Sequence, residues 1–274
     1  MRPAGWDGRI RRRAWGMSVL AVLLAISPSW GADPCPVPEP ERIPVDRSGA
    51  PVPVGELDPQ DRCLVGAVLN SPTTSGQVGP VRVPIPVAFY EYLLDHPVLM
   101  AALVRQLELG AYQFSARGPN QFWADDGDGT QGLLARIFRD RARRIYFIDG
   151  FHEGRMLPMV KGRAVIFLHY TPAVADGRPA VDLSLIAYTK LNDPVLSAMV
   201  FLLRPLIGEA VTRKMTHAFD VTTELSTIMA REPGRVLQAM AALPLLPEER
   251  QVVTAHLQEL AVNGSQAEPA RARP

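Results

Sequence analysis

The stretch Ala164–Ile207 decides the fold of this chain: AVIFLHYTPAVADGRPAVDLSLIAYTKLNDPVLSAMVFLLRPLI. Its first part contains two runs rich in β-branched and aromatic residues, 164–171 and 180–191, joined by the turn sequence ADGR. This pattern predicts two antiparallel strands in a hairpin. Asp193-Pro194 then predicts a helix start, because Asp caps a helix N-terminus and Pro fits the first turn. The chain therefore passes from a sheet directly into a long helix.

More strands and helices are expected on both sides of this stretch. Four upstream runs read as strands, at 112–115, 121–125, 133–139 and 144–152. Because short turns join all six strands, they must form an antiparallel sheet. A helical pattern at 87–109, broken at Pro97, precedes them. The long helix should run from 193 to 231 with a kink at Pro205, and shorter helices should follow at 235–242 and 248–262.

A helix, an antiparallel meander and a long final helix, in that order, resemble the START-like superfamily (SRPBCC, or polyketide-cyclase/lipid-transport). The resemblance covers Val81–Arg231 and depends on element order, the hairpin of 163–188 and the Asn192-Asp193-Pro194 helix start. It implies an α+β helix-grip fold, in which a curved antiparallel sheet of about six strands packs on the long C-terminal helix around a cavity for a hydrophobic ligand. The family usually has one more strand before the first helix, and 78–85 is the candidate for it.

The first 31 residues have the order of a secretory signal peptide. Arg9, Arg11, Arg12 and Arg13 precede an uncharged run from Ala14 to Ile26, and small residues follow. That run of about 13 residues is short for a spanning helix, which needs ~20. We therefore expect a secreted or periplasmic protein, with an uncleaved N-terminal anchor as the alternative.

The expected organisation has five parts. They are the signal peptide at 1–31, a proline-rich wrap or linker at 32–80, a START-like domain at 81–231, a helical extension at 232–263 and a disordered tail at 264–274. Cys35 and Cys63 are the only cysteines. In an oxidising compartment they would form a disulfide, which would stabilise the fold by roughly 3–4 kcal/mol. Two free thiols are the alternative.

Composition excludes several classes of function. With 29 Lys+Arg against 28 Asp+Glu, the chain lacks the basic excess of a nucleic-acid binder. Motifs for hydrolase, protease, nucleotide or dinucleotide chemistry are absent, and we expect no cofactor. The loop that begins at Asp126 has Gln131 and Ile137 where an EF-hand needs Gly and Glu, so we expect a plain turn and no metal site.

The segment Val195–Ile207 is apolar nearly all round, so it must be covered on more than one side. The sheet can cover one face, and the helix at 87–109, the N-terminal wrap, a bound lipid or a bilayer surface can cover the other. With the helix-grip resemblance, the expected ligand-binding residues are Phe114, Trp123, Phe147, Phe151, Phe167, Leu185, Met199, Leu203 and Leu206.

Polar residues offer a possible chemistry. In an extended strand, Asp149 and Glu153 share a side with Phe147 and Phe151, while His152 faces the other side. His169 shares a side with Val165 and Phe167 on the next strand, and Arg163 could meet an anionic end of the ligand. A carboxylate on an apolar face could act as a general base, as the superfamily's cyclases and isomerases imply. Alternatively, these carboxylates lie in water at a strand end and His169 is a core residue.

The hairpin at 136–144 contains Arg136, Arg139, Arg141, Arg143 and Arg144 with one acid, Asp140. We expect solvated edge charges, with a patch for anionic lipid head groups as the alternative. The sequence thus favours an exported carrier of a lipid or other hydrophobic small molecule, with transient membrane-surface contact. A cyclase or isomerase and a non-catalytic envelope scaffold are the rival hypotheses, and the oligomeric state is open.

Overall fold

The computed structural model describes residues 35–44, 51–154, 159–192 and 194–267, with the backbone alone at 194–207 and 263–267. The expected signal peptide at 1–31 lies outside this range. Of the expected tail at 264–274, residues 264–267 belong to the last helix and the rest lie outside the range. A seven-stranded antiparallel sheet has the order β1-β7-β6-β5-β4-β3-β2. Its strands are β1 (Thr74–Val83), β2 (Gln113–Gly118), β3 (Gln121–Asp125), β4 (Thr130–Arg139), β5 (Arg143–His152), β6 (Val160–Ala175) and β7 (Arg178–Leu191).

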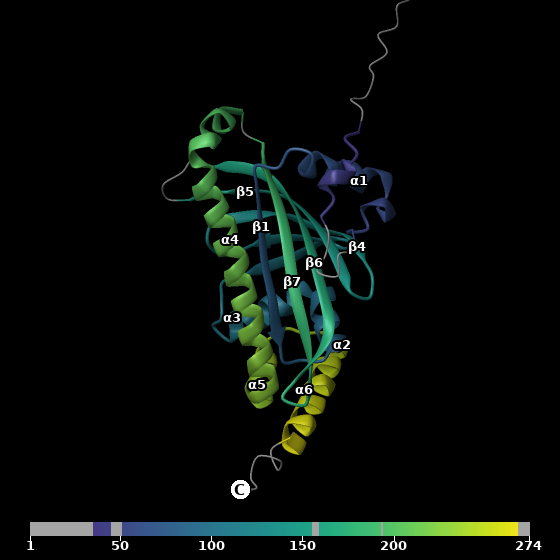
Figure 1. The fold of residues 1–274 in the computed structure, drawn as a ribbon. Coiled ribbons are helices and arrows are strands. Elements are labelled where there is room, and N and C mark those ends of the chain that lie inside the picture. Colours follow the sequence, from purple (N-terminus) through teal and green to yellow (C-terminus); the bar gives the residue numbers. More distant parts are fainter. Residues whose placement is uncertain (1–34, 45–50, 155–158, 193, 268–274) are drawn as a thin grey trace, which may run out of the picture. The chain divides into compact units, whose positions relative to one another are not determined.

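Helices precede, interrupt and follow the strands (Figure 1). Two 3-10 turns, η1 (Pro40–Arg42) and η2 (Val54–Glu56), lead to α1 (Pro59–Leu69), and α2 (Val87–Asp95) and α3 (Pro97–Gln106) connect β1 to β2. The C-terminal helices are α4 (Pro194–Arg231), α5 (Pro233–Ala241) and α6 (Pro247–Ala267). This is the α+β helix-grip arrangement expected from the sequence.

The strand β1 agrees in part with expectation. The six predicted strands are present, and β1, which overlaps the candidate strand at 78–85, is a seventh that begins earlier and pairs with β7 from Thr74 onward. The domain boundary expected at 81 therefore falls inside a strand, and the expected linker at 32–80 includes part of the sheet. Pro80 is tolerated because the pairing shifts between Val78 and Val81, so it needs no ladder hydrogen bond there.

Side chains alternate between the two faces of the sheet. We call the face on the α4 side the inner face and the face on the α1 side the outer face. On β7, Leu183 and Leu185 lie on the inner face with the core that includes α4, whereas Ile186 and Tyr188 lie on the outer face. This period of two fixes the face of each residue along every regular strand.

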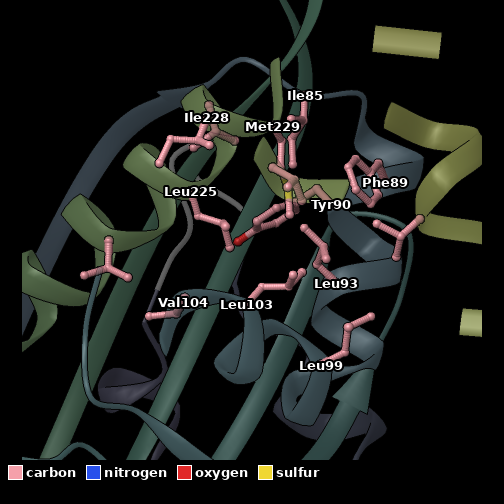
Figure 2. Close-up of a cluster of buried hydrophobic side chains, with 14 of the residues drawn as sticks. Ile85, Phe89, Tyr90, Leu93, Leu99, Leu103, Val104, Leu225, Ile228 and Met229 are labelled. Carbon is pink, nitrogen blue, oxygen red and sulfur yellow. The ribbon is translucent and has the colours of Figure 1, made fainter. Parts of the chain in front are cut away.

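The inner core gathers one end of the sheet with the helices α2 to α6. Figure 2 shows Phe89, Leu93 and Leu103 of α2 and α3 converging on Leu225 and Met229 of α4. The predicted break at Pro97 is confirmed, since α2 and α3 meet with a bend of 98°. These contacts fix the C-terminal half of α4 in a dry core.

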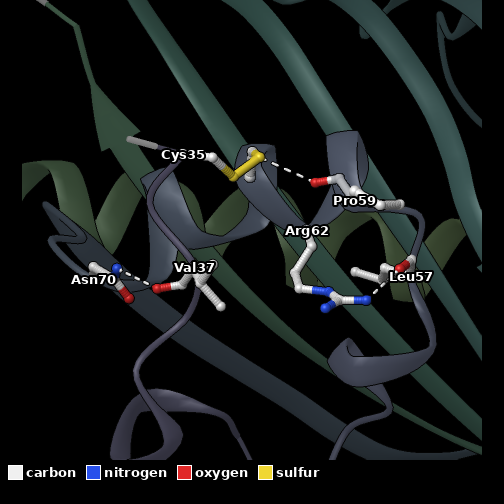
Figure 3. Close-up of a disulfide and its surroundings, with 7 residues drawn as sticks. Cys35, Val37, Leu57, Pro59, Arg62 and Asn70 are labelled. Atoms are coloured by element: carbon white, nitrogen blue, oxygen red, sulfur yellow. Dashed lines mark hydrogen bonds between the residues drawn. A yellow bond between two sulfur atoms is a disulfide. The ribbon is translucent and has the colours of Figure 1, made fainter. Parts of the chain in front are cut away.

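The outer core is formed by the N-terminal segment. Val54, Val65 and Val68 cover Phe147 and Phe167 of the sheet. Cys35 and Cys63 are disulfide-bonded with a Cα–Cα distance of 5.2 Å, which ties the start of this segment to α1 (Figure 3). The described parts of the proline-rich stretch, 35–44 and 51–69, thus wrap the outer face, and their prolines suit chain that makes few backbone hydrogen bonds.

Candidate functional site

Two consecutive residues of α4, Lys214 and Met215, contact strands near opposite edges of the sheet. At Lys214, the Nζ donates to Asp126 Oδ2 at 2.7 Å and to Asp128 Oδ2 at 2.9 Å in the β3–β4 turn. Next to it, Met215 lies against β1, where a Cβ added to Gly76 would be 2.4 Å from its Cε. Because β1 and β3 lie near opposite edges of the sheet, these two contacts require a curved sheet.

The β3–β4 turn is built to hold this lysine. Asp126 Oδ1 accepts hydrogen bonds from the backbone N–H groups of Asp128 and Thr130 at 2.8 and 2.9 Å. Burial alone would raise the pKa of Asp126, but these donors and the Lys214 ammonium hold it below its usual value. The lysine hydrogen bond likewise lowers the pKa of Asp128. The acidic turn that suggested a calcium loop therefore binds an amine of the chain itself.

Partly buried apolar side chains line the inner face of the strands that lead to this turn. Phe122, Leu134 and Ile148 are directly paired across β3, β4 and β5, and Phe114 and Ile166 flank them on β2 and β6. We call these five residues the apolar row. All five are half-buried, and none belongs to either core within the described part of the chain.

The residues of α4 around Gly208 lie at the level of the apolar row. Across the sheet, Ile148 pairs with Ala164 of β6, which pairs with Thr189 of β7, which pairs with Thr74 of β1. Ile148 and Thr74 therefore lie at the same level of the sheet. A Cβ added to Gly208 of α4 would lie 3.1 Å from the Oγ1 of Thr74. The apolar segment 194–207 precedes Gly208 in the helix.

The predicted ligand-binding residues do not form one group. Phe114 and Leu185 lie on the inner face, and Leu185 packs against the inner core. Trp123, Phe147, Phe151 and Phe167 project from the outer face, and Phe147 and Phe167 are buried there under the N-terminal segment. The expectation that they share a cavity with α4 was therefore wrong. The side chains of Met199, Leu203 and Leu206 lie outside the described residues.

The polar candidates also lie away from the apolar row. Asp149 and Arg163 face each other across β5 and β6 on the outer face and form an ion pair of 2.9 Å. Both are substantially exposed, at 48% and 39% of the side-chain surface. Glu153, just past β5, is exposed, and its N–H bonds to Gly129 O. These carboxylates therefore match the solvated alternative, and they do not converge on an inner-face site.

His169 and His152 lie on opposite faces, as the strand parity predicts. On the outer face, His169 borders a small pocket of about 20 Å3 that Val52 and Phe167 also line, large enough for about one water. On the inner face, the Nδ1 of His152 lies 3.1 Å from Thr130 Oγ1, beside the turn that holds Lys214. The described residues contain no group of three or more His, Cys, Asp or Glu side chains placed to bind a metal.

Several arginines of the hairpin at 136–144 form contacts within the fold instead of facing solvent. Arg136 and Arg139 both pair with Asp95 of α2, and Arg143 pairs with Asp140 at 2.7 Å. Arg144 is only 2% exposed, donates to Asp140 O and lies 5.4 Å from the centre of the Tyr170 ring. The interpretation as solvated edge charges was wrong for Arg136 and Arg144, because a helix 40 residues earlier in the sequence docks on the hairpin.

Sequence reasoning missed four members of the apolar row: Phe122, Leu134, Ile148 and Ile166. The signal was present in the alternation of each strand, since Phe122 and Trp123 are adjacent and must face opposite sides. The sequence did not indicate which of the two sides α4 would cover.

Comparisons with known proteins add little to this geometry. No family model matches the sequence, and no curated protein matches it. Solved structures that match include a conserved protein from Geobacillus kaustophilus, with 10% identity and a TM-score of 0.39. Another is Ara h 8.0201, with 14% identity and a TM-score of 0.32. Each match covers 56% of this chain and 95% of the other. Likeness this low supports no functional conclusion.

Among the described residues, no single helix is both long and apolar enough to cross a bilayer. The pair α2–α3 passes by length and composition together, but it is sharply bent. Many of its residues, including Phe89, Leu93, Leu99 and Leu103, are buried in the inner core.

Proposed function

We propose that this protein binds a lipid or other hydrophobic small molecule on the inner face of the sheet, between the apolar row and α4. The observation that supports this most is the apolar row itself. Five large hydrophobic side chains on neighbouring strands are only partly buried, although they lie on the side of the sheet that α4 covers. Burying such a surface is favourable, at ~25 cal/mol per Å2 of apolar area.

The ligand we propose has an apolar body. Neighbouring strands are ~4.8 Å apart, so a row from β2 to β6 extends over roughly 19 Å. Its side chains are two phenyl rings and three branched aliphatic chains, from Phe114 and Phe122 and from Leu134, Ile148 and Ile166. These groups offer dispersion contacts and no hydrogen bonds, so binding should follow hydrophobic area more than a particular head group.

Export and the START-like relationship belong to the same proposal. The Cys35–Cys63 disulfide fits an oxidising compartment, where such bonds persist. The sequence at 1–31 has the order of a signal peptide. The element order is that of the START-like superfamily, but fold-level analogy alone does not fix a function.

The rival enzyme hypothesis has weaker support. Asp149 and Arg163 neutralise each other on the outer face, where water reaches both. A general base needs to lie within hydrogen-bond reach of the reacting group. From the outer face, these side chains cannot reach a ligand bound at the apolar row, so we favour a carrier over a cyclase or isomerase.

Leu134 and Leu133 provide a matched test of the proposed site. They are consecutive residues of β4 and both are half-buried, but only Leu134 is on the inner face. We expect Leu134→Gln to weaken binding of the fluorescent probe 1-anilinonaphthalene-8-sulfonate about tenfold or more, which equals ~1.4 kcal/mol. Leu133→Gln should leave binding unchanged, with circular dichroism confirming that both variants fold.

Native ligand analysis completes the test. Organic extraction and mass spectrometry of natively purified protein should release a hydrophobic molecule at a reproducible molar ratio. The proposal is wrong if the purified protein is empty and binds no probe, or if both leucine variants weaken probe binding equally.

A further inference from the structure

The small pocket on the outer face collects polar side chains that the proposed function does not use. Arg143, His169 and Ser184 form a row in which each residue pairs directly with the next across β5, β6 and β7. Residues paired in this way have Cβ atoms ~4.5–5.5 Å apart, so their side chains can contact one ligand. Gln77 of the edge strand β1 also lines this pocket of about 20 Å3, which we call the outer pocket.

The outer core supplies the apolar part of the pocket lining. Ile145, Phe167 and Ile186 line the pocket and lie two residues along the same strands from the polar row. Ile145 and Phe167 are buried in the outer core, and Val52 of the N-terminal segment belongs to that core and also lines the pocket. The polar row is therefore held on regular strands beside a packed apolar layer, and its side chains do not depend on a loop for their positions.

The hydroxyl group of Ser184 is the strongest indication of a ligand. Ser184 is only 7% exposed, yet its side chain forms no hydrogen bond with any residue in the described part of the chain. The two other buried polar residues there, Arg144 and Ser226, both donate side-chain hydrogen bonds. A buried hydroxyl without a partner is costly, so folded proteins normally supply one. The side chains of His169 and Gln77 likewise have no hydrogen-bond partner among the described residues.

The chemistry of the lining favours an anionic oxygen. No Asp or Glu lines the outer pocket, whereas hydroxyl, imidazole, amide and guanidinium groups can all donate hydrogen bonds there. Asp140 does not line the pocket, and its Oδ2 accepts from both Nε and Nη2 of Arg143 at 2.7 Å, which fixes the guanidinium. The pocket has room for about one water, so it fits one oxygen atom of a ligand whose remainder lies in solvent beside the exposed Gln77.

We propose that the outer pocket binds an oxyanion, either a carboxylate or a phosphate group, through one oxygen that accepts hydrogen bonds from Ser184 and His169 beside the Arg143 guanidinium. Hydrogen bonds to an anionic acceptor are stronger than those to a neutral one. Because Asp140 already neutralises Arg143 in part, binding should be weak, with a dissociation constant of roughly 1–10 mM. The outer pocket lies on the opposite face of the sheet from the apolar row, so this proposal does not rest on the proposed function.

Nuclear magnetic resonance of the histidine rings tests the proposal directly. The chain has five histidines, and comparison with His169→Phe assigns the ring signals of His169. Titration of the disulfide-bonded protein with sodium phosphate or sodium acetate, at constant pH and ionic strength, should shift these signals until they saturate. The ring of His152, on the inner face, should not shift. Saturation with one salt identifies a phosphate or a carboxylate ligand, and saturation with both supports the shared chemistry. If neither salt saturates, the pocket is a water site and the proposal is overturned.

The variant Ser184→Ala separates a binding role from a structural one. Because the hydroxyl has no partner within the described chain, its removal should leave the melting temperature unchanged or raise it. Binding of the saturating anion should weaken at least threefold. Ser75→Ala is the matched control, since Ser75 is an exposed serine on the outer face of β1 that does not line the pocket. Unchanged binding in Ser184→Ala, equal weakening in both variants, or a lower melting temperature of Ser184→Ala would each overturn the proposed site.

Discussion

Gly79 shows how a single residue lets β1 join the sheet. It has φ of 102°, which residues with a Cβ rarely adopt, and it lies in the irregular part of the β1–β7 pairing. A Cβ there would be 2.5 Å from the carbonyl oxygen of Leu183. Both the backbone conformation and the space therefore require glycine at this position.

Replacing Gly79 should weaken the edge of the sheet that supports α4. We expect Gly79→Ala to lower the free energy of unfolding by more than ~2 kcal/mol, because backbone strain of ~1–2 kcal/mol adds to a clash with a rigid backbone atom. Gly177 is the control, since it also has positive φ, at 75°, but open space around it. Urea denaturation should show a smaller loss for Gly177→Ala, and equal losses would contradict the clash argument.

Single residues also show where sequence reasoning stops. The parity of Asp149, His152 and His169 could be predicted, because alternation along a strand is local. The burial of Arg144 could not, since it depends on Asp95 and on Tyr170 from distant parts of the chain. Burial raises the pKa of Tyr170, and its hydrogen bond to Glu91 raises it further. A buried polar network of this kind has no signature in the hairpin sequence itself.

Among the elements, α1 and the segment before it depend most on one covalent bond. Val65 and Val68 of α1 pack on the outer face, and Lys190 of β7 donates to Ala67 O at 2.8 Å. The Asn70 side chain holds the segment by donating to Val37 O at 2.9 Å (Figure 3). The disulfide closes this arrangement across a sequence separation of 28 residues.

Removing the disulfide should loosen the N-terminal segment first. We expect the double variant Cys35→Ser/Cys63→Ser to lose about 3–4 kcal/mol of unfolding free energy, because the unfolded chain regains the entropy of an open loop. Hydrogen exchange should rise in residues 35–69 before it rises in β6 and β7. The variant should be insensitive to a reductant that destabilises the wild-type protein. Equal stability of the two proteins would show that the apolar contacts of α1 suffice.

Elements were predicted better than their boundaries. The hairpin of β6 and β7 and the start of α4 followed from turn and capping residues at 175–178 and 193–194, which act locally. The strand β1 was only partly recognised, because its prolines are accommodated by the pairing shift at Val78–Val81. Long-range pairing with β7 supplies the strand's hydrogen bonds, and a proline-rich sequence contains no sign of that partner.

At the scale of the whole molecule, the sheet separates two apolar layers. The N-terminal segment covers one part of the outer face, and α2 to α6 cover one end of the inner face. The apolar row lies on the inner face outside both cores. The sequence could predict that an apolar helix and a sheet meet, but not which end of the sheet the helices would leave half-exposed. That choice follows from how α2 and α3 fold back at Pro97.

Acid should destabilise the molecule through its folded turns. Asp126, Asp128 and Asp140 have pKa values below the usual 3.8 in the folded state. For Asp140, burial would raise the pKa, but hydrogen bonds from Ala142 N and from Arg143 lower it more. A carboxyl with a depressed folded pKa stabilises the fold above its unfolded pKa and loses that contribution as pH falls through the folded value.

Stability should therefore be level from about pH 7 to 5 and fall as the pH drops below about 4. Thermal unfolding monitored by circular dichroism between pH 7 and 2 measures this. The variant Asp126→Asn/Asp140→Asn removes two of the three groups, so its melting temperature should be lower at pH 7 and less dependent on pH below 4. Asp149→Asn is the control, because its carboxylate forms an exposed ion pair and should change the curve little. An identical acid decline in the double variant and the wild type would show that Asp126 and Asp140 are not the acid-sensitive groups.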